Sequence, residues 1–289
     1  MQVERFHDVE VFAARAEAFL LAREAEHNLM LGIISTLRRF PEQYAHPVYL
    51  GVATERDEVV AVAMRTPPQN VALSLAHPES LTGDAALALA IDVHHVYGDG
   101  IPGVTGPVEF AAAFAHRWHD LTDRTYRVVM SERIYQLERV MPVTGVPGTL
   151  REAEERDVPL LAEWVESFQR EALPHEEHID GKAWARRRIA SPLSHTYLWE
   201  VEGKPVTMVG CGSPTAHGIR IAPVYTPPEL RGHGYGSACV AAVSQRQLDA
   251  GRRYCFLYTD LSNPTSNHIY QVVGYQPVSD STMYAFGIG

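Results

Sequence analysis

The chain has 289 residues, of which 46% are hydrophobic and 21% are charged. This composition is typical of globular proteins and provides enough apolar material for the cores of two domains. The formal net charge of −10 argues against nonspecific binding to nucleic acid, which depends on Lys and Arg. No apolar run approaches the roughly 18 residues that span a bilayer, and the N-terminus has no signal-peptide pattern. We therefore expect a cytoplasmic protein that binds neither nucleic acid nor membranes.

The first half of the chain shows both helical and strand periodicity. Apolar spacing predicts helices over residues 8–38, 84–97 and 108–119. Alternation of apolar and polar residues predicts strands over residues 48–53, 59–64, 126–130 and 134–140. Residues 141–148 then contain two prolines and two glycines, a composition that disfavours helix and central strand. We place the domain boundary there, which predicts domains 1–145 and 146–289.

The second half has the clearer pattern of alternating helices and strands. Helices are predicted over residues 160–170, 183–189, 235–250 and 263–274. Strands are predicted over residues 195–201, 205–211, 219–225 and 254–259, with two short strands at the end. The order predicts an α/β (or α+β) fold in which helices flank a mixed central sheet.

A glycine-rich turn joins the predicted strand 219–225 to the helix that follows it. Gly232, Gly234 and Gly236 have no Cβ atom, so the backbone can approach a ligand closely. The N–H groups that begin a helix lack intrahelical partners and carry the positive end of its dipole. Residues 220–253 also contain five arginines against two carboxylates. The turn is therefore predicted to bind an anion, and its extent suits a pyrophosphate.

Two common phosphate-binding motifs do not fit this turn. The P-loop requires a lysine after its last glycine, and none is present. The dinucleotide fingerprint has the spacing GxGxxG in its first strand–helix turn. Here the spacing is GxGxG, and the turn follows three predicted strands. A nucleotide-binding or nicotinamide-dependent enzyme is therefore disfavoured.

The turn resembles the signature of the GNAT superfamily, the acyl-CoA-dependent N-acetyltransferases. That signature is Gln or Arg, any two residues, Gly, any residue, and Gly or Ala, which Arg-Gly-His-Gly-Tyr-Gly at 231–236 matches at every position. The element order of residues 149–286 is also similar to that fold. Residues 1–141 have similar elements but no such signature. The resemblance therefore implies two tandem GNAT-like domains, of which the first is degenerate, and one CoA site.

The resemblance also implies roles for individual residues around the turn. The backbone of the preceding strand would pair with the pantetheine arm of CoA through Val224, Tyr225 and Thr226. The pyrophosphate would be held by amides of Arg231, Gly232, His233, Gly234, Tyr235, Gly236 and Ser237. The implied cosubstrate is acetyl-CoA, without a metal.

Residues 263–274 predict a complete short helix just past the strand 254–259. Asn263 is in the N-cap position and Gly274 in the C′ position. Asn267 and Tyr270 are three residues apart and share the face opposite the apolar stripe, where they could contact a ligand. By the resemblance, Tyr270 protonates the departing thiolate, and Asn263 contacts the cofactor.

The general base is the least defined part of the predicted site. Some relatives carry a glutamate on the strand before the turn, but residues 219–225 contain no carboxylate. The candidates between the first two helices of the second domain are Glu166, Glu171, His175, Glu176, Glu177 and His178, of which we choose Glu177. A metal site at His175–His178 is disfavoured because no third ligand is apparent. Arg186–Arg188 is interpreted as a solvated helix face.

These features predict transfer of an acetyl or other acyl group from acetyl-CoA to a primary amine. The expected partners are acetyl-CoA and a small amine, and a homodimer is left open. The alternative is a non-catalytic acyl-CoA sensor that regulates another protein, which the absence of a strand carboxylate favours and Tyr270 disfavours.

Overall fold

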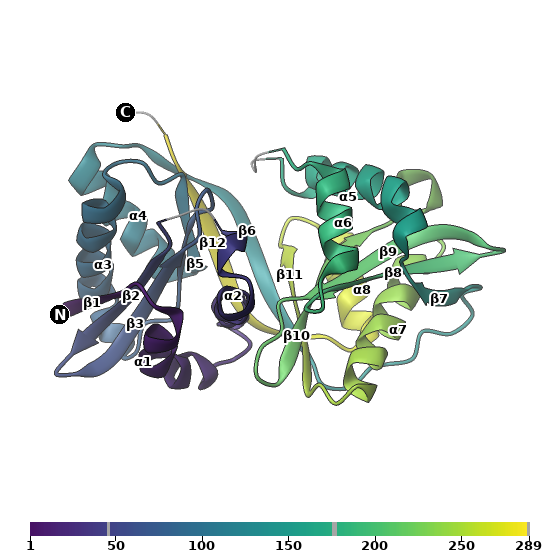
Figure 1. Cartoon of the computed structure of the whole chain (residues 1–289), viewed down its shortest axis with the longest axis horizontal. Coiled ribbons are helices and arrows are strands. Elements are labelled where there is room, and N and C mark those ends of the chain that lie inside the picture. Colours follow the sequence, from purple (N-terminus) through teal and green to yellow (C-terminus); the bar gives the residue numbers. More distant parts are fainter. Residues whose placement is uncertain (45–46, 175–177, 288–289) are drawn as a thin grey trace. The chain divides into compact units, whose positions relative to one another are not determined.

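The chain forms two compact units in a computed structural model that describes residues 1–44, 47–174 and 178–287 (Figure 1). Unit 1 contains Met1–Ile134 and the chain from Val278 on, and unit 2 contains Tyr135–Pro277. The sequence-based boundary at 145/146 differs from this division. The proline- and glycine-rich segment at 141–148 is a loop within unit 2, and the chain passes from unit 1 to unit 2 inside a strand. The last strand of the chain belongs mainly to unit 1.

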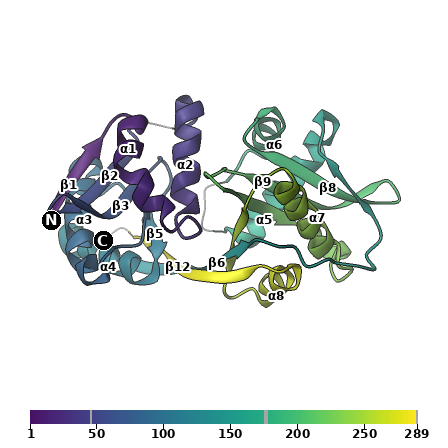
Figure 2. The same cartoon turned by 90° about the horizontal axis from the view of Figure 1, so that it is seen from below.

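Unit 1 is a mixed sheet with helices on both faces. Its strands follow the order β1 (Gln2–Phe6), β2 (Tyr49–Glu55), β3 (Glu58–Arg65), β4 (Val71–Leu73), β5 (Gly103–Pro107), β12 (Gln276–Phe286) and β6 (Tyr126–Leu137). Its helices are α1 (Val9–Leu21), α2 (Asn28–Arg39), α3 (Thr82–Tyr97) and α4 (Val108–Thr122). Helices α1 and α2 lie on one face and α3 and α4 on the other (Figure 2).

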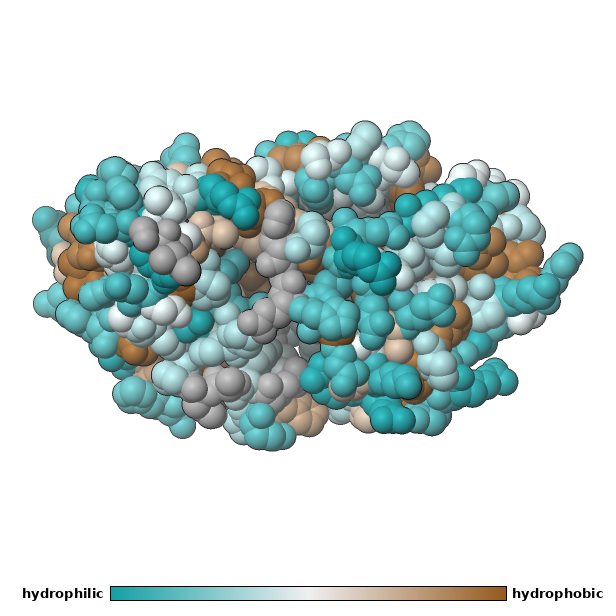
Figure 3. All heavy atoms as spheres, turned by 90° about the horizontal axis from the view of Figure 1, so that it is seen from above, coloured by the Kyte–Doolittle hydropathy of each residue, from teal (hydrophilic) through white to brown (hydrophobic). Residues whose placement is uncertain are grey.

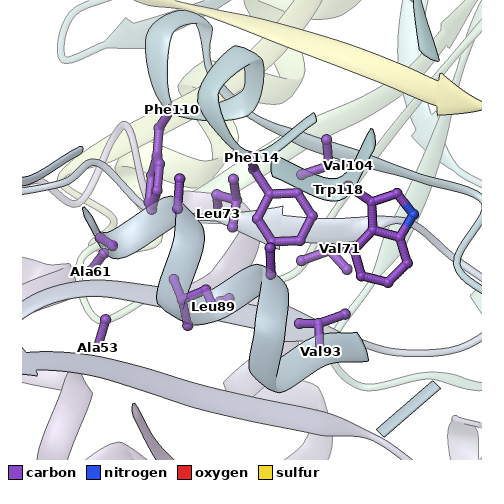
Figure 4. Close-up of a cluster of buried hydrophobic side chains, with 14 of the residues drawn as sticks. Ala53, Ala61, Val71, Leu73, Leu89, Val93, Val104, Phe110, Phe114 and Trp118 are labelled. Carbon is purple, nitrogen blue, oxygen red and sulfur yellow. The ribbon is translucent and has the colours of Figure 1, made fainter. Parts of the chain in front are cut away.

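Large side chains of α3 and α4 fill the core on the second of these faces. Phe110, Phe114 and Trp118 of α4 point toward the sheet, where Val71 and Val104 meet them (Figure 4). The rings of Phe114 and Trp118 stack with their centroids 6.0 Å apart. The core explains the helical spacing of the apolar residues in this part of the sequence.

The predicted helix over residues 8–38 is wrong in one respect, because the structure has two helices there. Asn28 starts the second helix, and its side-chain amide donates to the carbonyl of Ala25 at 2.7 Å. The preceding His27 is 2% exposed, and its Nδ1 lies 2.9 Å from the carbonyl oxygen of Leu20. These polar contacts end one helix and begin another, although the apolar spacing continues through both.

Three strands of unit 1, β1, β4 and β5, were not predicted. β4 has only three residues, too few to show a period. β5 has the sequence Gly-Val-Thr-Gly-Pro, which is typical of a loop. Its neighbours explain the glycines: a Cβ on Gly103 would collide with the carbonyl oxygen of Tyr284, and one on Gly106 would lie 2.8 Å from Cβ of Leu73.

Unit 2 is also a mixed sheet between two pairs of helices. Its strands follow the order β11 (Tyr254–Asp260), β10 (Gly218–Tyr225), β9 (Lys204–Gly212), β8 (His195–Val201) and β7 (Thr149–Glu152). Helices α5 (Val158–Ala172) and α6 (Gly181–Ala190) cover one face, and α7 (Tyr235–Asp249) and α8 (Pro264–Val273) cover the other (Figure 1). The predicted mixed α/β fold class is therefore confirmed for both units.

The predicted strand pairs at 126–140 and at the chain end are wrong, because each is one long strand, β6 and β12. Apolar side chains lie in small separate groups on a mostly hydrophilic face (Figure 3). Scattered exposed apolar residues are normal for a folded protein.

Candidate functional site

Two parallel strands of unit 2, β10 and β11, part from one another. Their ladder joins Gly218, Ile219 and Arg220 to Tyr254, Cys255 and Phe256. Beyond these pairs β10 continues to Tyr225 and β11 to Asp260, with no further pairing between them in the described chain. The register between β10 and β9 also shifts between Ile221 and Val224. The C-terminal half of β10 therefore presents backbone groups that an extended ligand with amide groups can pair with.

The glycine turn lies at the end of β10 and opens helix α7. Gly232 and Gly234 have φ angles of 83° and 80°, in the left-handed region that favours glycine. Gly234 is the N-cap of α7 and provides no side-chain cap. The amides from Gly232 to Ser237 have no acceptor among the described residues, and the first bond into the helix runs from the amide of Ala238 to the carbonyl of Gly234 at 3.0 Å. Together with the helix dipole, these amides form a site for an anion.

Arg231 fixes the turn from its N-terminal side. Its Nε donates to the carbonyl of Thr226 at 2.8 Å, and its Nη2 donates to Oε2 of Glu171 on α5 at 2.6 Å. The hydroxyl of Tyr225 donates to the other oxygen of Glu171 at 3.1 Å. The hydroxyls of Thr226 and Thr207 lie 2.7 Å apart. The side chain of Arg231 therefore connects the turn to α5 through these hydrogen bonds.

The remaining residues of the turn line its outer surface. The rings of His233 and Tyr235 stack, with centroids 5.3 Å apart and planes 11° apart. A Cβ added to Gly236 would meet only Oγ1 of Thr226, at 3.5 Å. Val224 packs on the α7 side of the sheet, whereas Tyr225 packs against Trp164 on the α5 side.

Asn263 and Asn267 both have their side chains engaged within the protein. Oδ1 of Asn263 accepts from the amide of Ser266 at 3.0 Å, the predicted N-cap contact. Nδ2 of Asn267 donates to the carbonyls of Asp260 and Asn263, at 2.9 and 2.8 Å. Its Oδ1 accepts from the hydroxyl of Tyr135 at 3.1 Å. The bond to Asp260 therefore ties α8 to the end of β11, and the bond to Asn263 supports the start of α8 itself.

We expect Asn267→Ala to lower the free energy of unfolding by about 2 kcal/mol, since each lost hydrogen bond contributes about 0.5–1.5 kcal/mol. Urea denaturation followed by circular dichroism measures this change. The control is His268→Ala on the exposed side of the same helix, which should leave the midpoint unchanged. An Asn267→Ala midpoint equal to that of the wild type would contradict the structural role.

Tyr270 lies in the core on the α7 and α8 side of unit 2. It is 8% exposed, and its ring lies 6.4 Å from the ring of Tyr135 and 6.0 Å from that of Tyr275. Its hydroxyl makes no hydrogen bond to the described residues. Burial raises the pKa of Tyr270 to about 12. The phenol therefore keeps its proton at neutral pH and has it free to donate.

The residues considered as the general base have different surroundings in the structure. Oε1 of Glu166 accepts from the amide of Gly181 at 3.1 Å, and Glu171 pairs with Arg231. His178 is exposed. The chosen base Glu177, together with His175 and Glu176, lies outside the described residues.

Sequence reasoning missed the supporting partners of this site. Tyr135 comes from β6 yet bonds to Asn267, 132 residues further along the chain. Thr207 of β9 meets Thr226. None of these residues belongs to a local pattern, so no sequence signal marks them.

Metal and membrane features can be stated only for the described part of the chain. No group of three His, Cys, Asp or Glu side chains there could hold a metal ion. In that same part, no helix combines the length and the apolar character needed to cross a bilayer.

Comparison with a family model finds a match within unit 2. Residues 158–275 match the model of the acetyltransferase (GNAT) family. This part of the chain is therefore similar to a GNAT acetyltransferase domain. No significant match was found among curated proteins.

Several solved structures share the fold along nearly the whole chain. A tandem GNAT protein from the clavulanic acid biosynthesis pathway has a TM-score of 0.63 at 14% identity, covering 99% of this chain and 98% of its own. A GCN5-related N-acetyltransferase from Sphaerobacter thermophilus has a TM-score of 0.64 at 18% identity, covering 98% and 94%. A Drosophila protein has a TM-score of 0.68 at 10% identity, covering 99% and 98%. At these identities the likeness concerns the fold.

Proposed function

We propose that unit 2 is an N-acetyltransferase that moves the acetyl group of acetyl-CoA to a primary amine of a small acceptor. The observation that carries the proposal is the row of unpaired amides from Gly232 to Ser237, at the end of a strand that parts from its neighbour. The amides suit a pyrophosphate, and the free edge of β10 at Val224–Thr226 suits the amide groups of the pantetheine arm. This arrangement matches the requirements of coenzyme A at both ends.

The proposed reaction requires a base that deprotonates the amine and an acid that protonates the leaving thiolate. An alkylamine with a pKa of about 10.4 is protonated at pH 7, and its deprotonation costs about 4.6 kcal/mol. A base, for which Glu177 stays the candidate, accepts that proton. The amine nitrogen then forms a bond to the carbonyl carbon while the carbon–sulfur bond breaks. Tyr270 donates its proton to the leaving sulfur, which makes the thiol a better leaving group.

The segment of unit 1 between β4 and α3 supports the proposal of a single cosubstrate site per chain. After β4, the amides of Ser74 and His77 donate to the carbonyls of Val62 and Val60 at 2.9 and 2.8 Å. The amide of Leu75 donates to Nε2 of His27 at 3.0 Å, and burial lowers the pKa of His27 to about 4, so this ring is neutral. Residues 74–81 contain no glycine, and Asp84 lies in the first turn of α3. The amides of Ser74, Leu75 and His77 therefore already have acceptors and are not available to a pyrophosphate.

Titration of the wild-type protein with acetyl-CoA by calorimetry tests the proposal. We expect one site per chain and, with a panel of primary amines, release of free thiol. Binding without thiol release on any amine would favour the non-catalytic acyl-CoA sensor. Absence of acetyl-CoA binding would overturn the proposal altogether.

A further inference from the structure

Arg188, in the last turn of α6, packs against the sheet of unit 2. Its hydrogen-bond partners among the described residues are neutral groups. Its Nη2 donates to the carbonyls of His195 and Cys211, both at 2.9 Å, and lies 3.4 Å from that of Ala222. Its Nε lies 3.4 Å from Oγ1 of Thr196. No carboxylate of the described residues pairs with this guanidinium. The prediction of a solvated face for Arg186–Arg188 is therefore wrong for this residue.

The sheet is shaped to admit the guanidinium. A Cβ on Gly210 would lie 2.5 Å from Nη2 of Arg188, and a Cβ on Gly212 would lie 3.3 Å from Nη1. Because β9 has glycine at both positions, the guanidinium can lie against the backbone between β8, β9 and β10. Any larger residue at Gly210 would displace it.

No carboxylate of residues 1–44, 47–174 and 178–287 compensates the charge of Arg188. Burial lowers the pKa of Arg188 to about 10, so the side chain is still cationic at neutral pH. A buried charge is costly unless it is paired. The Nη1 group donates to no described residue, and the side chain is only partly buried, so a ligand can reach it. The free Nη1 group of a charged guanidinium can donate a charge-assisted hydrogen bond to a carboxylate.

The location of Arg188 connects it with the proposed reaction centre. Ala222 is two residues past Arg220, where β10 leaves β11. Arg220 lies directly opposite Gly212 on β9, so its side chain leaves the sheet on the same face as Arg188. The guanidinium of Arg220 lies 5.7 Å from the ring centroid of Tyr258. Two arginines therefore face the α6 side of the sheet beside the opening between the strands.

We propose that the acceptor is an amine that also carries a carboxylate, and that Arg188, supported by the positive charge of Arg220, binds this carboxylate. The inference rests on the proposed acetyltransferase function and specifies its substrate class. Pairing with the acceptor would compensate the arginine charge and would hold the amine close to the point where β10 and β11 separate. An amine without an anionic group would leave Nη1 of Arg188 unpaired.

The test compares matched acceptors and matched variants. Each amino acid with a primary amine, except aspartate and glutamate, is compared with the amine that remains when its α-carboxylate is removed, using thiol release from acetyl-CoA. We expect kcat/KM to be at least about 100-fold higher for one or more amino acids than for the matching amine. Arg188→Lys should reduce this preference at least about 10-fold, mainly through a higher KM for the carboxylate-bearing acceptor. The control Arg187→Lys, at an exposed position of the same helix, should change neither value.

A second variant guards against a purely structural effect of Arg188→Lys. Arg220→Gln leaves the carbonyl contacts of Arg188 in place and should still reduce the preference for carboxylate-bearing acceptors. Equal or better turnover of the decarboxylated amines by the wild type would overturn the inference while the acetyltransferase function stands. Retention of the preference in both arginine variants would overturn it as well. Failure to bind acetyl-CoA would instead refute the proposed function, which calorimetry shows separately.

Discussion

Gly236→Glu is expected to weaken acetyl-CoA binding at least about 100-fold without unfolding unit 2. Gly236 is in the first turn of α7, and an added Cβ would meet only Oγ1 of Thr226, at 3.5 Å. A carboxylate there stabilises the helix N-terminus by about 0.3–1 kcal/mol. The same carboxylate would repel a pyrophosphate by about 4 kcal/mol per charge pair at 4 Å near a protein surface. Stability and binding should therefore change in opposite directions.

Calorimetry and thermal denaturation measure these two effects on the same samples. Gly236→Gln adds the same bulk without the charge and should lose much less affinity than Gly236→Glu. Gly234 is a poorer choice, because its φ of 80° and the methyl group of Val146 at 2.9 Å would add strain to any side chain. An unchanged dissociation constant for Gly236→Glu would mean that the turn does not hold the pyrophosphate.

Local patterns were enough to predict the centre of the candidate site. The glycine turn, the cap at Asn263 and the left-handed Gly274 depend on residues close together in the chain, and each is found where the sequence indicates. The mixed α/β class follows from the same local patterns, because helical and strand periods are set by each element's own buried face.

Features that depend on distant partners could not be predicted. β5 reads as a loop because its glycines make room for neighbours, and its partner β12 comes at the end of the chain: Ser281 Oγ bonds to the carbonyl of Gly106, 175 residues away. The burial of Arg188 depends in the same way on Gly210 and Gly212 of another strand. A sequence pattern shows which face of an element is buried, but it does not show which distant segment covers it.

Tyr270→Phe is expected to lower kcat about 100-fold and to leave the affinity for acetyl-CoA unchanged. General acid catalysis by a positioned side chain contributes about 10²–10⁴-fold. The hydroxyl of Tyr270 has no hydrogen bond to lose in the described structure, and the ring contacts with Tyr135 and Tyr275 are kept. Removing a hydroxyl that bonds to none of the described residues should leave stability nearly unchanged.

Tyr275→Phe is the matched control, with the opposite pattern expected. The hydroxyl of Tyr275 lies 2.8 Å from that of Ser244 in the same core, so its loss should cost about 1 kcal/mol of stability and leave kcat unchanged.

The pH dependence of stability and turnover gives a further check on Tyr270. Because the folded pKa of Tyr270 is raised from 10.0 to about 12, its protonated form stabilises the fold, and this contribution is lost as pH rises from 10 toward 12. Tyr270→Phe should remove that part of the alkaline loss of stability. Below pH 10 Tyr270 keeps its proton, so wild-type turnover should not fall there through loss of this acid. A kcat of Tyr270→Phe equal to that of the wild type would assign proton donation to another group.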